Sequence, residues 1–407
     1  MNESTFAPGG GQPGLAQDAA GQAGLSEPAA RSHAVDSVSV RTFEARQQSG
    51  YTPTHGSYGS SYGQQSRRDG AGLGEPAKQQ AVGTEVEPGL PAYVEGPDGQ
   101  FYDPDAEYEP DPEYAATLAP DVARQRRERV GPTGRPLPYF PIPTPLSEHG
   151  PAQIIAMCNQ KGGVGKTTST INLGAALAEY GRRVLLVDFD PQGALSVGLG
   201  VNPMELELTV YNLLMERGVS ADDVLLKTAV PNMDLLPSNI DLSAAEVQLV
   251  SEVARESSLA RALKPLMPDY DYIIIDCQPS LGLLTVNALT AANSVIVPLE
   301  CEFFALRGVA LLTETIEKVC ERLNPELALD GILATMYDSR TVHSREVLAR
   351  VVEAFGDHVF HTVIGRTVRF PETTVAGEPI TTYASNSVGA AAYRQLAREV
   401  LARCPAE

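Results

Sequence analysis

A glycine-rich segment with two lysines and two threonines, residues 159–168, holds the side chains best suited to chemistry in this sequence. It reads Asn-Gln-Lys-Gly-Gly-Val-Gly-Lys-Thr-Thr. Glycines let successive backbone N–H groups curl around phosphate oxygens, and a helix that starts there adds its positive dipole end. In such a P-loop, Lys166 would contact the β- and γ-phosphates and the Thr167 hydroxyl would bind Mg²⁺. The sequence therefore predicts a nucleotide site whose phosphate contacts come from Gly162, Gly163, Val164, Gly165, Lys166, Thr167 and Thr168.

The residues on either side of this loop form the elements that must position it. Residues 154–158, Ile-Ile-Ala-Met-Cys, are a short apolar run of the kind found in buried strands. After the loop, apolar residues return at helical spacing from Ile171 to Leu177. A strand, a glycine-rich loop and a helix in this order are the context that a P-loop needs. A glycine-rich turn before an ordinary helix is the simpler alternative, and the Gly-Lys-Thr-Thr sequence in this context disfavours it.

Carboxylates follow two further apolar runs of buried-strand type. Residues 184–187 lead to Asp188 and Asp190, and residues 272–275 lead to Asp276. The alternate spacing of Asp188 and Asp190, with a bend after the second, lets both side chains reach the phosphate end of the loop. Asp276 is placed as the Mg²⁺ ligand on a second strand. The alternative for Asp188 and Asp190 is that both only cap a strand end, and the Pro-Gln-Gly that follows Asp190 makes it weak. An isolated apolar run that ends in an aspartate is common, but the position of Asp276 about 110 residues after the P-loop, in an alternating pattern, supports its assignment.

The remainder of the chain alternates between strand-like and helix-like segments. The predicted strands are residues 294–298 and 331–336, and the predicted helices are residues 303–319, 347–355 and 393–401. This alternation indicates an α/β fold, a doubly wound and mostly parallel twisted sheet with helices on both faces, as in P-loop NTPases. In such a sheet the ligand binds at the carboxyl ends of the strands.

Glycine and proline are distributed unevenly along the 407 residues. Residues 1–150 hold 20 of the 36 glycines and 18 of the 31 prolines, together with 20 acidic and 11 basic residues. A segment of this composition cannot bury enough apolar surface to offset the entropy of ordering. We therefore expect residues 1–150 to be a disordered Gly/Pro/Gln-rich and acidic tail, and residues 151–407 to be one folded domain.

An acidic stretch with aromatic residues lies within this tail. Residues 95–113 contain eight acidic residues and no lysine or arginine. The stretch is either a docking segment for a partner protein or a solvated spacer. We favour the spacer, because blocks of charge are common in disordered tails.

Charge and cysteine content exclude several classes of protein. The formal net charge is −20, so any DNA contact would need a local basic patch that acts against the overall field. No apolar run approaches the roughly 18 residues of a membrane span, and the N-terminus lacks the basic and apolar regions of a signal peptide. The five cysteines are odd in number and form no CxxC motif. These features predict a reduced cytoplasmic protein without a disulfide framework or a zinc site.

Two departures from the general P-loop pattern point to one family. Gln160 stands where the general pattern has glycine, and Lys161 is an additional lysine. Three further segments look like those of the same family: residues 188–193, 299–308 and 336–341. Over residues 153–403 the chain resembles the ParA/Soj partitioning ATPases of the ParA/MinD superfamily, and the tail would be a long N-terminal extension.

The resemblance implies an enzyme that hydrolyses ATP with Mg²⁺. Lys161 resembles the signature lysine of the family, which reaches the nucleotide of the partner subunit and acts there like an arginine finger. Asp190 would orient the attacking water, and Asp188 would help to organise the site around water and metal. Met336 and the loop that ends at Arg366 are candidates to hold the adenine. The catalytic residues would be Lys161, Lys166, Asp188 and Asp190.

The resemblance also implies partners. Members of this family form ATP-dependent homodimers that bind DNA without sequence preference, and a ParB-like activator stimulates hydrolysis. One guanidinium group can bridge two phosphate oxygens, which suits arginine to this contact. The DNA-binding residues would be Arg340, Arg345, Arg366 and Arg369; four solvated surface arginines are the simpler interpretation. We expect a cytoplasmic, nucleoid-associated protein that acts in chromosome partitioning or organisation.

Other classes remain open. The chain could instead be a nucleotide-binding scaffold or regulator that recruits condensin, division or replication-initiation partners through its tail, with little DNA binding. Gln278 departs from the family pattern, which favours a different loop shape. Residues 370–374 also depart from it, which favours a different partner. A cobyrinate- or biotin-type amidoligase would need additional substrate-binding chemistry that we do not find. No membrane helix of MinD type is expected, because the apolar stripe of residues 393–401 is suited to core packing.

Overall fold

The computed structural model describes residues 94–95, 101–102, 130–302 and 305–405. Most of the predicted tail, including most of the acidic stretch of residues 95–113, lies outside these residues. Within the tail, strands β1 (Val94–Glu95) and β2 (Phe101–Tyr102) pair with each other in antiparallel orientation.

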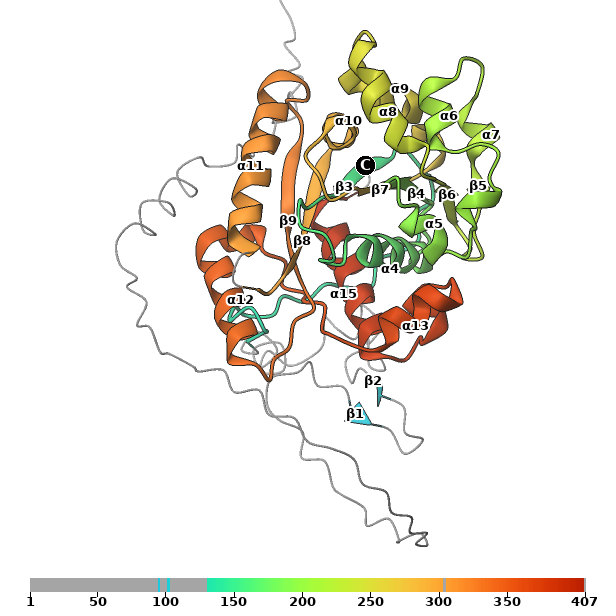
Figure 1. Ribbon diagram of the computed structural model, residues 1–407. Coiled ribbons are helices and arrows are strands. Elements are labelled where there is room, and N and C mark those ends of the chain that lie inside the picture. The colour runs from blue at the N-terminus through green and yellow to red at the C-terminus, as the bar shows by residue number, and fades with distance from the viewer. Residues whose placement is uncertain (1–93, 96–100, 103–129, 303–304, 406–407) are drawn as a thin grey trace, which may run out of the picture. The chain divides into compact units, whose positions relative to one another are not determined.

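A seven-stranded sheet forms the centre of the domain, in the order β5-β6-β4-β7-β3-β8-β9 (Figure 1). All neighbouring strands are parallel except β5 and β6. The predicted doubly wound and mostly parallel sheet is therefore confirmed. The strands are β3 (Gln153–Met157), β4 (Val184–Phe189), β5 (Leu226–Lys227), β6 (Met233–Leu236), β7 (Tyr272–Cys277), β8 (Ser294–Glu300) and β9 (Ala328–Thr335).

Helices cover both faces of this sheet. The α-helices are α4 (Lys166–Glu179), α5 (Ala194–Gly198), α6 (Val210–Met215), α7 (Ala221–Val224), α8 (Leu242–Gln248), α9 (Ser258–Leu263), α10 (Leu283–Ala291), α11 (Ala305–Arg322), α12 (Val342–Phe355), α13 (Arg369–Ala376), α14 (Ile380–Tyr383) and α15 (Val388–Arg403). The described part of the chain also contains the short 3-10 helices η1 (Pro203–Glu205), η2 (Leu249–Ser251), η3 (Arg255–Ser257), η4 (Lys264–Asp269) and η5 (Gly356–His358). Among the residues that the structure describes, no helix combines the length and the apolar character that a bilayer span requires.

The two faces of the sheet build two separate cores, because side chains alternate across each strand. In β3, Ile154 and Ala156 belong to the core that includes residues of α9, α10, α11 and α12. Ile155 and Met157 belong to the core that includes residues of α4 and α15, and these two helices lie side by side in Figure 1. Strands buried on both faces are apolar along most of their length, which is why the sequence shows continuous apolar runs.

Helices α12 and α15 begin five residues earlier than the sequence predicts. The Thr341 hydroxyl accepts a hydrogen bond from the Ser344 N–H at the start of α12. The Ser387 hydroxyl accepts one from the Ala390 N–H at the start of α15. Caps of this kind define where a helix begins, whereas the first turns carry mostly polar or small residues that give no apolar periodicity.

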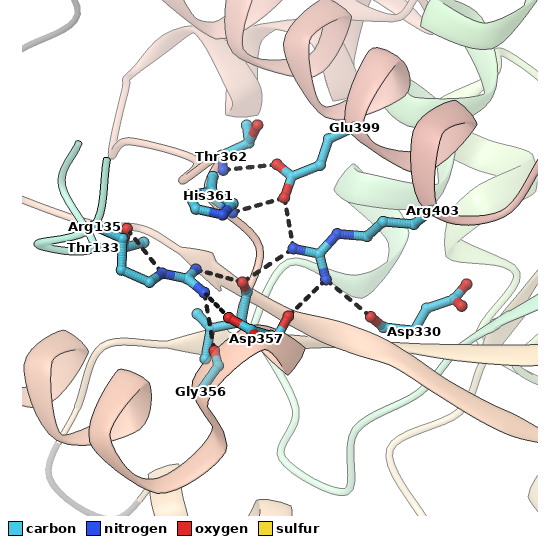
Figure 2. Close-up of polar contacts among 10 residues, drawn as sticks. Thr133, Arg135, Asp330, Gly356, Asp357, His361, Thr362, Glu399 and Arg403 are labelled. Carbon is cyan, nitrogen blue, oxygen red and sulfur yellow. Dashed lines mark hydrogen bonds and ion pairs between the residues drawn. The ribbon is translucent and has the colours of Figure 1, made fainter. Parts of the chain in front are cut away.

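Residues 130–150, which we call the strap, contact the domain at both of their ends. Near the first end, Arg135 Nη1 donates to the Gly356 carbonyl at 3.0 Å and Nη2 to the Val359 carbonyl at 2.5 Å (Figure 2). Arg403 of α15 donates to the same Val359 carbonyl at 3.2 Å. It also pairs with Glu399, a fully buried carboxylate.

The second end of the strap contacts a buried carboxylate before β7. Asp271 is 1% exposed and accepts hydrogen bonds from the backbone N–H groups of Gly150 and Arg183 at 3.0 and 2.7 Å. His149 Nδ1 lies 2.8 Å from Asp271 Oδ2. The predicted boundary at residue 150 therefore falls at the end of a segment that contacts the domain.

Candidate nucleotide site

The glycine-rich loop joins β3 to α4 at the carboxyl edge of the sheet. Gly163 and Gly165 have φ angles of 76° and 83°, a left-handed conformation that glycine adopts most readily. No side chain caps the start of α4, so its first backbone N–H groups are available to an anion. The Thr335 hydroxyl at the end of β9 donates to the Val164 carbonyl at 2.8 Å. This contact fixes the middle of the loop against the sheet.

Thr167 and Asp276 form the direct link between the loop and β7. The Thr167 hydroxyl donates to Asp276 Oδ2 at 2.6 Å. Asp276 Oδ1 is buried and has no hydrogen-bond partner within the described part of the chain. Burial raises the pKa of the Asp276 carboxyl to about 8, and the charge of Asp188 adds to this shift. Hydroxyl and carboxylate oxygens are ligands that Mg²⁺ prefers, and a cation here would give Oδ1 a partner.

Lys166 and Lys161 both lie at this edge. Lys166 is 7% exposed, and its ammonium group donates to the Lys161 carbonyl at 3.3 Å. The Lys161 ammonium lies 3.0 Å from Glu300 Oε2 and 2.6 Å from Glu302 Oε2. These two carboxylates lie at the end of β8 and just after it. The sequence predicts the lysine but not its partners.

Asp188 and Asp276 lie opposite each other in the register of β4 and β7. Asp188 is fully buried and accepts hydrogen bonds from the Ser196 N–H at 2.8 Å and the Ser196 hydroxyl at 2.7 Å. Burial raises the pKa of Asp188 to about 6 although the Ser196 bonds oppose this shift. Asp190 is half-buried, and its Oδ1 accepts from the Gln192 N–H at 2.9 Å. The two carboxylates thus differ: one is locked in the interior and the other lies at the start of a loop.

The candidate adenine residues lie on adjacent segments beyond β9. Met336 follows Thr335 directly and has a φ of 50°. The Tyr337 N–H donates to the Ile364 carbonyl, and the Arg366 N–H donates to the Tyr337 carbonyl, both at 3.0 Å. The structure therefore brings Met336 close to the loop of residues 364–366, and Thr335 links both to the P-loop.

The candidate DNA-binding arginines are exposed, and most have a carboxylate partner. Arg340 pairs with Asp338 at 2.9 Å, Arg366 with Glu300 at 3.3 Å and Arg369 with Glu372 at 3.0 Å. Arg345 donates to the Ser339 carbonyl at 2.5 Å. The positive charge that a DNA phosphate would meet is therefore partly neutralised within the chain.

Sequence reasoning missed several residues that organise this edge. Ser196 holds Asp188, and Asn159 donates to the Pro298 carbonyl at 2.7 Å and thereby ties the start of the loop to β8. Gln278, which departs from the family pattern, donates to Glu246 at 3.3 Å. Single polar residues of this kind leave no periodic signal. The signal for Asn159 was its position between a buried strand and the P-loop.

Comparison with known proteins identifies the family. A family model described as an AAA domain matches residues 152–329. The sporulation initiation inhibitor protein Soj of Bacillus subtilis is 48% identical over 250 residues, which cover 61% of this chain and 98% of Soj. An uncharacterized protein of Mycobacterium tuberculosis is 66% identical over 300 residues, 74% of this chain and 93% of that protein. Only 257 residues follow position 150, so part of this longer match lies before it.

A solved structure with the same fold carries a different name. It is described as cobyrinic acid a,c-diamide synthase from Mycobacterium smegmatis with bound ADP and magnesium. It is 47% identical, superposes with a TM-score of 0.54, and covers 60% of this chain and 92% of its own. The variant P-loop, the carboxylates on β4 and β7 and the match to almost all of Soj lead to one conclusion. The chain belongs to the ParA/Soj family of the ParA/MinD superfamily of P-loop NTPases.

Proposed function

We propose that the protein is an ATPase switch of ParA/Soj type. It binds ATP with Mg²⁺, closes into a homodimer in the ATP state, binds DNA without sequence preference as that dimer, and releases it after hydrolysis. One observation carries the proposal: Asp276 Oδ1 is buried and has no hydrogen-bond partner in the described part of the chain. The other oxygen of this carboxylate accepts from the Thr167 hydroxyl, at the start of a helix that no side chain caps. This arrangement fits a metal–triphosphate group.

Each residue at this edge has a task in the proposed reaction. Thr167 and Asp276 hold Mg²⁺, which neutralises charge on the phosphate oxygens. Lys166 exchanges the Lys161 carbonyl for the β- and γ-phosphates, and the backbone N–H groups of the loop surround them. Asp190 accepts a hydrogen bond from the attacking water and orients it. Asp188 stays buried and, through Ser196, holds the loop that carries Asp190.

Lys161 acts in trans in this proposal. Its ammonium group reaches the nucleotide of the partner subunit and stabilises charge on the transferred phosphoryl oxygens. Met336 and the loop ending at Arg366 hold the adenine. The output is chromosome partitioning or organisation at the nucleoid, with a ParB-like activator, as the likeness to Soj and the ParA proteins supports.

The DNA-binding surface consists of the exposed arginines Arg340, Arg345, Arg366 and Arg369. They contact phosphates, because such contacts need no base sequence. Each arginine that pairs with a carboxylate has to exchange it for a phosphate. The overall charge of −20 repels DNA, so these local contacts act against an unfavourable field.

A scaffold or regulator is the second candidate. It binds nucleotide, has little affinity for DNA, and recruits condensin, division or replication-initiation proteins through the tail. The pairing of three candidate arginines with carboxylates favours it. The name of the Mycobacterium smegmatis structure raises an amidoligase as a third candidate, which would consume ATP only with a second substrate.

The test measures DNA binding without nucleotide, with ADP and with ATP, across a salt series, in a preparation that is shown to bind ATP. The expected result is ATP-dependent binding whose affinity falls steeply with salt, because phosphate contacts release counterions. Lys166→Ala and Asp190→Ala should abolish ATP hydrolysis. Absence of DNA binding at low salt would favour the scaffold, and hydrolysis by both variants at the rate of the parent would refute the ATPase switch.

A further inference from the structure

Two carboxylates hold Lys161 on its own subunit. Its ammonium group makes hydrogen-bonded ion pairs with Glu300 at 3.0 Å and with Glu302 at 2.6 Å. The Lys161 side chain is 40% exposed, the Glu300 side chain 14% and the Glu302 side chain 54%. Glu300 is therefore largely shielded from water, which strengthens its ion pair, whereas Glu302 is accessible to water.

The backbone presents both carboxylates to this lysine. Glu300 is the last residue of β8, and the Glu302 N–H donates to the Glu300 carbonyl at 2.7 Å in a tight turn. Asn159 bonds to β8 through its amide and accepts from the Lys161 N–H at 2.9 Å. The lysine backbone is thus fixed to the strand that carries its partners.

The charges at this point form a small network. Glu300 Oε1 lies 3.3 Å from Arg366, while its Oε2 contacts Lys161. Burial alone would lower the pKa of Lys161, but the hydrogen bonds with Glu302 and Glu300 outweigh it and the pKa is raised. The hydrogen bond from Lys161 lowers the pKa of Glu302. At neutral pH the lysine is therefore charged and paired.

We propose that Glu300 and Glu302 form a latch that holds the trans-acting Lys161 on its own subunit until a partner subunit presents a nucleotide. This proposal rests on the proposed function, since it requires Lys161 to act in trans. Glu300 and Glu302 are positioning residues and do not touch the nucleotide. The triphosphate bound to the partner subunit carries more negative charge than Glu300 and Glu302, and Glu300 also pairs with Arg366. The triphosphate can therefore compete with the two carboxylates for Lys161.

The latch makes dimer formation conditional on nucleotide. When the dimer closes, each subunit has to release its Lys161. A weaker latch therefore lowers the free energy needed for dimerisation once in each subunit. An exposed ion pair contributes up to about fivefold in an equilibrium constant. Removal of the Glu302 charge from both subunits should therefore lower the protein concentration needed for half-dimerisation by about two- to 25-fold.

The test compares Glu302→Gln with Glu314→Gln in the full-length chain. Glu314 lies on α11, is 51% exposed and pairs with Lys318 at 3.8 Å, so this control removes the same charge from the surface. Dimerisation is measured by analytical ultracentrifugation over a concentration series, with Mg²⁺ and a non-hydrolysable ATP analogue. Glu302→Gln should dimerise at lower concentration than the control. In a Lys161→Ala background, Glu302→Gln should give no gain.

A second readout tests the ion pair without dimerisation. Acetylation of Lys161 by limiting acetic anhydride, followed by peptide mass spectrometry, needs the neutral amine. Without nucleotide, Glu302→Gln should accelerate this acetylation about two- to fivefold, and Glu314→Gln should not. If the parent dimerises with the analogue but Glu302→Gln matches the control in both assays, the latch is wrong and the switch stands. If no form dimerises with the analogue, the switch fails and the latch has no role, whatever the acetylation shows.

Discussion

The Thr167 hydroxyl donates to Asp276 Oδ2 at 2.6 Å and joins the P-loop to β7. It leaves the other carboxylate oxygen buried without a partner in the described chain. A metal ion is the group best suited to meet that oxygen, because it binds carboxylate and hydroxyl together. The geometry therefore predicts that Mg²⁺ contributes to nucleotide affinity through the Thr167 hydroxyl and Asp276.

Asp276→Asn should abolish most of the effect of Mg²⁺ on nucleotide binding. An amide cannot supply the negative charge that the ion requires, so the tightening of ATP affinity by Mg²⁺ should fall at least tenfold (about 1.4 kcal/mol). Titration of a fluorescent ATP analogue in Mg²⁺ and in EDTA measures the effect. Thr290→Ala, which removes a helical threonine hydroxyl away from the loop, serves as a control. An unchanged response of Asp276→Asn to Mg²⁺ would exclude this site.

Ser196→Ala should destabilise the protein and slow hydrolysis together. The Ser196 hydroxyl donates to buried Asp188 and accepts from the Ser238 N–H at 3.1 Å. Its removal leaves two buried polar groups short of a partner, which costs about 2 kcal/mol of unfolding free energy. Urea unfolding measures the loss, with the exposed Ser243→Ala as the control. Equal stability of the two variants would mean that the hydroxyl does not anchor the loop.

The sequence predicts the fold and the phosphate site because both are encoded in contiguous runs. A strand buried on two faces is apolar along most of its length, and the P-loop residues belong to one short segment. The partners of Lys161 are not predictable in this way. They lie 139 and 141 positions away and become neighbours only because β3 pairs with β8. Strand order is a property of the whole sheet, and no local pattern determines it.

Asp338→Asn should strengthen ATP-dependent DNA binding if Arg340 contacts phosphate. Hydrogen bonds from the Arg340 side chain and backbone lower the pKa of Asp338 to about 2. An ordinary aspartate becomes protonated as the pH falls through about 4. With its lowered pKa, Asp338 stays charged and paired below that pH, and the pair is lost only as the pH falls through about 2. Arg340 therefore stays paired throughout the pH range of DNA assays.

Neutralising Asp338 should raise DNA affinity about two- to fivefold at low salt, since the arginine no longer has to exchange a partner. Fluorescence anisotropy with labelled duplex DNA measures the change. Glu346→Gln removes one exposed negative charge from α12 and controls for the general field. An equal gain in both variants would show that only net charge matters, and the role of Arg340 would be withdrawn.

We propose that the strap belongs to the folded domain as its first segment, and truncation tests this directly. Deletion of residues 1–129 should leave the urea midpoint unchanged, whereas deletion of residues 1–150 should lower it. The second deletion removes the Arg135 bonds to the Gly356 and Val359 carbonyls and the contacts with buried Asp271. Arg135→Ala in the full chain should cost about 2 kcal/mol, and Arg350→Ala on the exposed side of α12 little. Equal midpoints for the two deletions would place the start of the folded domain at residue 151.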